Sequence, residues 1–227
     1  MKEELIQGIV LRATPFKDRQ YILTLLSKHK GIVNIILKGV TSQKNHLRLC
    51  CEILSEAEFL CRETPSSLFT SREASLIDCR IELRKQYSFL TTGMHFAKTI
   101  LDSQYPGKPS PELYYFFSLY VKHIPSFEHN FNAFTSSFYL KLLNHEGLFT
   151  PLPVCEICQS QGAFALIGKD FFCQDHLPSG AILFSKEEWS NIHQLSQAAS
   201  FSCLKKIHVH DDLKEKIEFY YTSSIQH

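Results

Sequence analysis

The sequence has 227 residues, a hydrophobic fraction of 44% and a formal net charge of +1. The length allows two domains, and the hydrophobic content supports a packed core and excludes an intrinsically disordered chain. No stretch approaches the roughly 18 apolar residues that span a bilayer, and the N-terminus lacks the apolar segment of a signal peptide, so we expect a cytoplasmic protein. In that reducing compartment the eight cysteines are not expected to form disulfides.

The first 75 residues predict β-strands. Three runs of β-branched and large apolar residues are separated by turn signals, and two weaker runs follow them. The expected strands are residues 8–13, 20–26, 32–37, 56–62 and 67–71, with a turn signal at residues 64–67. Five strands this short fit a small closed barrel, because closure leaves no exposed strand edge.

From about residue 79 the apolar residues recur mainly at spacings of three and four, which predicts helices. The first helix is expected at about residues 79–103, with an apolar face formed by Ile81, Tyr87, Leu90, Met94, Ala97 and Leu101. A second helix should begin at Ser110 or Pro111 and end at Pro125. A third should span residues 130–145, with Gly147 just beyond its end.

Two more helices are expected near the C-terminus. Ser185 followed by Glu188 is the pattern of a capping box, and Asp211 or Asp212 can cap a last helix that runs to Tyr221. The change from strands to helices predicts an α+β fold with domains at residues 1–78 and 79–227. A turn-rich insert at about residues 150–180 interrupts the helical domain.

The turn-rich insert contains two pairs of metal-ligand residues. Cys155 and Cys158 are separated by two residues, and Cys173 and His176 repeat this spacing after 14 intervening residues. Residues 162–172, between the pairs, predict a hairpin that brings the two turns together. Because Zn²⁺ takes four sulfur and nitrogen ligands in a tetrahedron, these side chains predict a structural zinc site. A reduced cysteine cluster without metal is the alternative.

The sequence predicts a protein that is not an enzyme. Four protein ligands leave no open position on the metal at which a water could be activated. A zinc deaminase would need a His-x-Glu segment, and none of the 11 histidines has Glu two residues later. The sequence also lacks the usual phosphate-binding and nucleophile motifs. His208 and His210 alone are too few ligands for a second metal.

Positive charge is concentrated near the N-terminus. Residues 1–50 contain nine Lys and Arg against three acidic residues, a net charge of +6, whereas residues 151–227 contain six against nine, a net charge of −3. A basic segment in a nearly neutral chain favours a localised anionic partner, and a solvated lysine-rich surface is the alternative.

Three segments resemble the bacterial recombination-mediator family RecO. They are residues 8–31 (GIVLRATPFKDRQYILTLLSKHKG), residues 36–39 (ILKG) and residues 145–151 (HEGLFTP), the last of which precedes the first cysteine pair. The order of barrel, helices and inserted zinc motif is similar as well. The resemblance implies an N-terminal OB-fold, a helical domain that carries the zinc motif, and no catalytic residues. It also implies binding to single- and double-stranded DNA, strand annealing, and action with RecR to load RecA onto DNA coated by single-stranded-DNA-binding protein.

An OB-fold holds single strands in a basic groove with aromatic rings that stack on the bases. We therefore predict a DNA-binding face formed by Arg12, Lys17, Arg19, Lys38, Lys44 and Arg48. Two positions depart from the family: residues 40–43 stand where arginines are usual, and His176 stands where cysteine is frequent. A protein-interaction adaptor with a structural zinc ribbon, which binds no DNA, is the competing interpretation.

Overall fold

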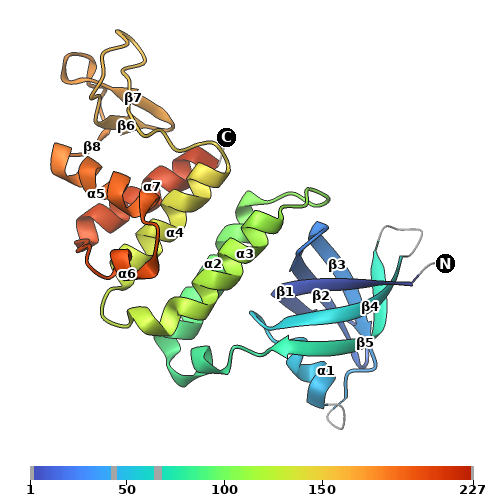
Figure 1. The fold of residues 1–227 in the computed structure, drawn as a ribbon. Coiled ribbons are helices and arrows are strands. Elements are labelled where there is room, and N and C mark those ends of the chain that lie inside the picture. The colour runs from blue at the N-terminus through green and yellow to red at the C-terminus, as the bar shows by residue number, and fades with distance from the viewer. Residues whose placement is uncertain (1–2, 42–44, 64–67, 226–227) are drawn as a thin grey trace. The chain divides into compact units, whose positions relative to one another are not determined.

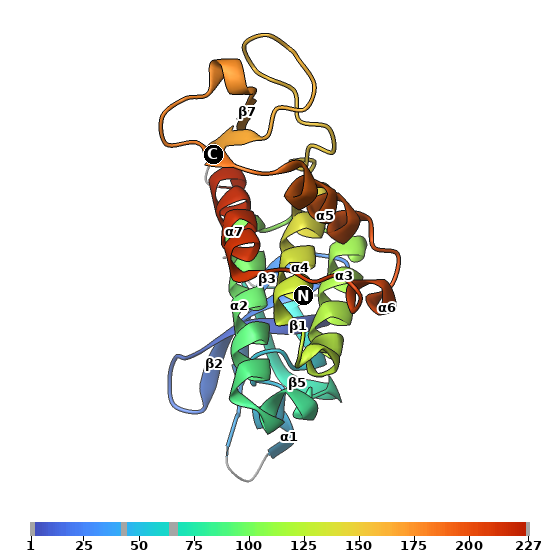
Figure 2. The same cartoon turned by 90° about the vertical axis from the view of Figure 1, so that its left-hand side faces the viewer.

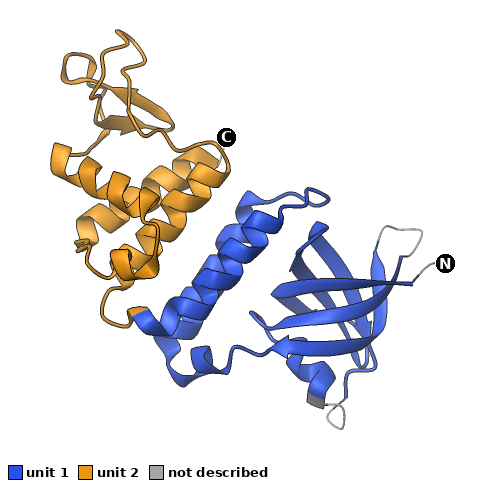
Figure 3. Ribbon diagram, in the orientation of Figure 1, with its two compact units in different colours: residues 1–126 blue, residues 127–227 orange. Residues whose placement is uncertain are grey.

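A computed structural model describes residues 3–41, 45–63 and 68–225. Contacts divide the chain into two compact units, Met1–Ser126 and Phe127–His227, which Figure 3 shows in different colours. The first unit contains a five-stranded sheet and two long helices, and the second contains packed helices and a small sheet. Within the described ranges, no helix combines the length and the apolar character needed to cross a membrane.

The large sheet of the first unit closes on itself as a barrel (Figure 1). Its strands are β1 (Glu3–Pro15), β2 (Gln20–Ser27), β3 (Gly31–Lys38), β4 (Glu56–Glu63) and β5 (Phe69–Asp78). They pair in the order β1-β2-β3-β5-β4, and β4 pairs with β1 to complete the circle. The pair β3–β5 is parallel, and the other four pairs are antiparallel.

Alternating side chains fill the barrel. Leu23, Leu25 and Ile35 are buried in its core. Between these positions, on the outer face, the Thr24 hydroxyl donates a 2.8 Å hydrogen bond to Oδ1 of Asn34. The period of two along each strand thus supplies the barrel core and places this polar pair on the other face of the sheet.

Strands β1 and β5 are longer than the sequence predicts. Residues 3–9 of β1 pair with β4, whereas its C-terminal part pairs with β2 across a bulge between Val10 and Arg12. Strand β5 continues through polar residues to Asp78, because its backbone pairs with the whole length of β4. Because these extensions are held by backbone pairing, the pattern of apolar side chains in the sequence does not reveal them. The turn expected at residues 64–67 lies outside the described residues.

A short helix that the sequence does not signal, α1 (Asn45–Leu49), follows β3. Leu47, Cys50 and Cys51 are buried in the barrel core. Burial raises the pKa of the Cys50 thiol to about 11, so it behaves as a small apolar side chain.

The first predicted helix begins later than expected, and its predicted apolar face is wrong at Ile81, Tyr87 and Met94, although Ala97 is buried. A 3-10 turn, η1 (Ile81–Lys85), ends at Gln86, whose extended backbone separates it from α2 (Tyr87–Ser103). Tyr87 is 85% exposed and Met94 is 43% exposed. The buried residues are Phe89, Gly93, Phe96, Ala97, Thr99 and Ile100. Apolar residues occupy more than one side of this helix, so their spacing alone cannot select the side that packs.

The signals for the next helix ends are confirmed. Helix α3 (Pro111–His123) follows Ser110, whose hydroxyl accepts a 3.2 Å hydrogen bond from the N–H of Leu113. Beyond it, Pro125 lies in the 3-10 turn η2 (Ile124–Phe127). Helix α4 (Phe131–His145) is followed by Gly147 at φ 72°, which glycine adopts at little cost.

Helix α4 is the centre of the second unit. It packs against α5 (Lys186–Gln197), α6 (Phe201–Leu204) and α7 (Asp211–Ile225), and Figure 2 shows it between α5 and α7. The predicted capping box opens α5: the N–H of Glu188 donates to the Ser185 hydroxyl, and the N–H of Ser185 donates to the Glu188 carboxylate. In the chain, the segment that connects α4 to α5 forms a small antiparallel sheet of β6 (Ala165–Ile167), β7 (Asp170–Phe172) and β8 (Ile182–Leu183).

Candidate metal centre and nucleic-acid interface

Two tight turns present the metal-ligand residues of the insert. In the first, the N–H of Gln159 donates to the carbonyl of Cys155, and Gln159 itself is left-handed at φ 59°. In the second, Cys173 directly follows β7, and the N–H of His176 donates to its carbonyl in the 3-10 turn η3 (Gln174–His176). The N–H of Glu156 donates to the carbonyl of Phe171, which attaches the first turn to β7.

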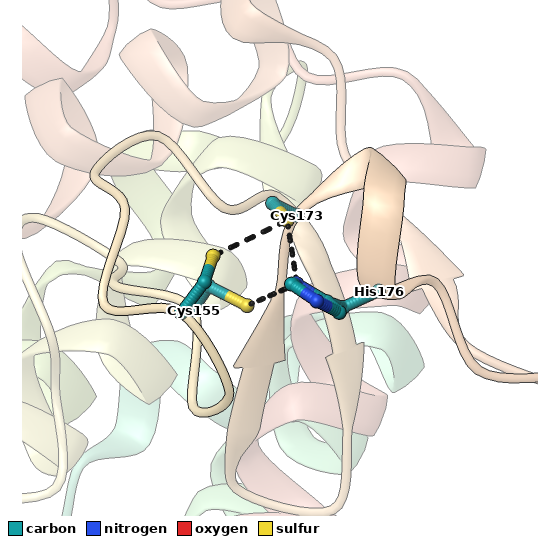
Figure 4. Close-up of side chains that lie close together, drawn as sticks. Cys155, Cys173 and His176 are labelled. Atoms are coloured by element: carbon teal, nitrogen blue, oxygen red, sulfur yellow. Dashed lines mark hydrogen bonds between the residues drawn. The ribbon is translucent and has the colours of Figure 1, made fainter.

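The four predicted ligand atoms converge. All lie within 4.8 Å of one another. Nδ1 of His176 is 3.6 Å from Sγ of Cys155 and 3.3 Å from Sγ of Cys173, and Sγ of Cys158 is 3.7 Å from Sγ of Cys173. Figure 4 draws the two contacts of His176 as dashed lines. A tetrahedral zinc ion with ordinary bond lengths separates two sulfurs by about 3.8 Å and a sulfur from a nitrogen by about 3.6 Å. The side chains therefore match the size of a tetrahedral zinc site.

Hydrogen bonds prepare two of the thiols as metal ligands. Burial would raise the pKa of Cys155, but the backbone N–H groups of Cys158 and Cys173 outweigh it and hold this pKa at about 6. The Ser160 hydroxyl, 3.2 Å from Sγ of Cys158, lowers the pKa of that thiol. Burial and then Cys158 raise the pKa of Cys173. The hydrogen bond to Cys155 raises the pKa of His176. Elsewhere in the described part of the chain, no other group of three or more potential ligands gathers in this way.

An aromatic cluster that the sequence analysis missed anchors the insert. The ring of Trp189 on α5 lies 5.3 to 6.5 Å from five other rings, those of Phe149, Phe164, Phe171, Phe184 and Tyr220. Its indole N–H donates a 3.3 Å hydrogen bond to the carbonyl of Pro151. The density of Phe around the cysteine pairs was the available signal, but spacing did not show that one tryptophan collects these rings.

Three of the predicted DNA-binding residues meet at the β1–β2 turn. Lys17 and Arg19 are exposed in this turn, and Lys38 is placed beside it, because Gln20 pairs with Lys38 and the N–H of Gly39 donates to the carbonyl of Arg19. The turn and the residues after β3 enclose a hollow of about 530 Å³. Nζ of Lys17 lies 5.3 Å from the ring centroid of its neighbour Phe16, so a cation and an aromatic face stand together.

Two of the other predicted residues lie on other elements. Arg12 is exposed further along β1, where it pairs with Thr24. Arg48 is exposed on α1, which packs against β5. Lys44 lies outside the described residues. The DNA-binding role of each of the six residues therefore stays a prediction.

Comparisons with known proteins point to one family. The family model described as "Recombination protein O N terminal" matches residues 1–80. Over 225 residues the chain is 27% identical to the DNA repair protein RecO of Chlamydia muridarum, covering 96% of this chain and 94% of that one. It is 26% identical to the DNA repair protein RecO of Chlamydia trachomatis serovar D, with coverages of 96% and 90%. It is 25% identical to that of Bacillus subtilis, with coverages of 74% and 66%.

Proposed function

Because the chain belongs to the RecO family of DNA repair proteins, we propose that it is a recombination mediator that binds DNA through its N-terminal barrel. We assign residues 1–78 to an OB-fold DNA-binding domain and residues 79–227 to a helical domain with a zinc-binding insert at about residues 150–180. In this role it binds and anneals single- and double-stranded DNA, and helps load the recombinase onto single strands coated by single-stranded-DNA-binding protein. Its partners are then RecR and that coating protein, at the nucleoid in the bacterial cytoplasm, and it needs no catalytic residue of its own.

The observation that carries the DNA-binding proposal is the grouping of cations at the β1–β2 turn. Lys17 and Arg19 line one hollow at the turn, and Lys38 pairs with Gln20 next to them. Phe16, which precedes Lys17, is 49% exposed. Among the described residues Arg19 forms one ion pair, with Asp18 at 3.7 Å, and both side chains are largely exposed, so little of its charge is neutralised. Cations next to an exposed ring suit a single strand, because phosphates need charge and bases need a face on which to stack.

The insert supports a structural role for a metal. Cys155, Cys158, Cys173 and His176 would hold one Zn²⁺, which would cross-link the two turns and supply no catalytic chemistry, since all four positions are taken by protein. We therefore assign zinc to the architecture of the second unit and not to contact with DNA.

Binding of a fluorescent single-stranded oligonucleotide across a salt series tests the DNA proposal. We expect tight binding at low salt and a log-linear loss of affinity as salt rises, with a slope that reports the number of phosphates contacted. Absence of binding at low salt would instead favour the adaptor.

The adaptor is the second candidate, and one observation favours it. The insert exposes apolar side chains that do not pack on their own unit: Leu152 is 66% exposed, Ile157 61% and Leu183 53%. Residues 151–227 also carry a net charge of −3, which disfavours DNA there. A protein partner on the insert is compatible with DNA on the barrel, so the adaptor replaces the mediator only if the barrel binds no DNA.

A further inference from the structure

The turn between β2 and β3 carries a second set of cations, at the opposite end of β2 from the predicted DNA face. Residues 28–30 are Lys28, His29 and Lys30. The loop between α2 and α3 lies directly against this turn, because Pro106 forms backbone bridges with Gly31 and Ile32. The contact is close enough that a Cβ on Gly31 would lie 2.3 Å from the carbonyl oxygen of Lys108.

A pocket of about 490 Å³ opens between the turn and the loop. Its lining includes His29, Lys30, Asn34, Phe69, Pro106 and Gly107. Nζ of Lys30 lies 5.2 Å from the ring centroid of Phe69 and 3.0 Å from the Glu4 carboxylate. Lys30 is therefore largely neutralised, and the free positive charge of this region belongs to its neighbours.

Two of those neighbours are lysines, one in contact with an exposed aromatic ring and one close to another in the sequence. Nζ of Lys28 lies 5.1 Å from the ring centroid of Tyr115, which is 50% exposed on α3. Lys108 is exposed in the loop, three residues after Tyr105, which is 79% exposed. Throughout the described ranges, neither Lys28 nor Lys108 forms an ion pair. Cations that alternate with exposed rings are the pattern by which proteins hold single strands, because the rings stack on any base.

We infer that this turn and loop form a second contact for single-stranded nucleic acid, in which Lys28 and Lys108 neutralise phosphates and Tyr105 and Tyr115 stack on bases. The inference rests on the proposed DNA-binding function and extends the path of the strand. The eight residues of β2 span about 26 Å, so only a strand long enough to follow this distance reaches both contacts. The exposed rings favour nucleic acid over an acidic peptide, which would need the lysines alone.

The test compares two oligothymidylate probes, of about 4 and about 20 nucleotides, chosen to lie at the lower limit and beyond the upper limit of site sizes for one OB-fold. Their affinity for the full chain is measured by anisotropy across a salt series. The variant is Lys28→Gln with Lys108→Gln. Its control is Lys85→Gln with Lys122→Gln, which makes the same change of charge at two exposed lysines of the same unit. Thermal unfolding checks that both variants are folded.

We expect the variant to lower the salt slope for the longer probe by about 1.4, the value for two lost phosphate contacts on a single strand. The slope for the shorter probe should not change, and the control should leave both slopes as in the parent protein. Tyr105→Ala, which alters no charge, should weaken binding of the longer probe about five-fold or more. If the double variant does not fold, Lys108→Gln alone should lower the slope by about 0.7.

Unchanged affinity and slope for the longer probe, in a parent protein that binds it, would overturn the second contact and leave the DNA function of the barrel in place. The lysines would then belong to a surface for an acidic protein or to plain solvent. If the parent protein binds neither probe at low salt, the proposed function fails and this inference fails with it.

Discussion

The guanidinium of Arg80 lies 2.6 Å from a carboxylate oxygen of Glu56, and both residues are buried within the first unit. The other carboxylate oxygen of Glu56 accepts hydrogen bonds from the Tyr114 hydroxyl and from the side-chain amide of Gln7. Burial first, and then the bond to Glu56, raise the pKa of Tyr114, so its hydroxyl stays a donor. One buried carboxylate thus joins strands β1 and β4 to helix α3.

Removing one partner from this pair should destabilise the protein strongly. Arg80→Met leaves the Glu56 carboxylate buried without its cation, and such a change costs about 3 to 5 kcal/mol of unfolding free energy. Lys85→Met is the matched control, because Lys85 forms an exposed pair with Glu82 at 2.6 Å and should cost less than about 1 kcal/mol. Urea denaturation measures both values. Equal values for the two variants would show that the buried pair contributes no more than a surface pair.

The proposed zinc site makes a prediction of stoichiometry. Purified protein should contain about one zinc ion per chain, because the four ligands complete one tetrahedron. Cys173→Ser removes a ligand and should lower the zinc content measured by inductively coupled plasma mass spectrometry. Cys203→Ser is the control, since Cys203 is exposed and lies outside the cluster. Folded parent protein with far less than one zinc would count against the site.

Metal affinity should fall as the pH falls. A thiol must lose its proton to bind metal, and Cys155, with a pKa of about 6, stays deprotonated until the pH drops through that value. The raised pKa of His176 keeps its imidazole protonated to a higher pH than usual, so its proton competes in the same direction. The thiolate absorption of cobalt-substituted protein should therefore fade as pH is lowered from about 8 to about 5. A constant signal over this range would contradict the assignment of these ligands.

The β1–β2 turn predicts a specific loss of DNA affinity. Lys17→Gln with Lys38→Gln should reduce the salt slope for single-stranded DNA by about 1.4 and weaken binding at low salt. Lys169→Gln with Lys186→Gln makes the same change of charge on exposed residues of the second unit and should leave the slope unchanged. Anisotropy titrations measure both. An equal loss in the two variants would mean that net charge, and not this turn, governs the affinity.

The docking of the α2–α3 loop can be tested through Gly31. In Gly31→Ala the new Cβ meets the carbonyl of Lys108, and overpacking of this kind costs about 1 to 3 kcal/mol beyond the strain of the left-handed backbone. Gly39→Ala is the control, because Gly39 is also left-handed, at φ 81° compared with 67° for Gly31. A Cβ on Gly39 would meet nothing within 4 Å. The difference in unfolding free energy between the two variants isolates the contact. A difference near zero would mean that the loop moves aside.

Features set by neighbouring residues could be predicted from the sequence. Three such features each involve residues only a few positions apart, and each appears in the structure. They are the capping box at Ser185, the cap at Ser110 and the spacing of the cysteine pairs. The three strongest strands were also found, because runs of β-branched and apolar residues between turn signals are a local pattern.

Features that depend on distant partners could not be predicted. The exposed side of α2 at Tyr87 follows from what packs on the opposite side, and the contact of Gly31 with Lys108 joins residues far apart in the chain. Arg48 was grouped with the other cations because helix α1 left no signal, and α1 moves it to another element. The four predicted metal ligands come together in the structure, whereas the DNA-binding role of the basic residues stays a prediction.

The rings around Trp189 hold the base of the insert, whereas the four ligands close its tip. The attachment through the rings depends only on the protein's own apolar side chains. The attachment through the four ligands depends on the metal available in the cell. When zinc is scarce, the tip should open and its cysteines become exposed to oxidation, while the rings keep the insert seated on α5. Scarcity of the metal would then alter one end of the unit and spare the helices beneath it.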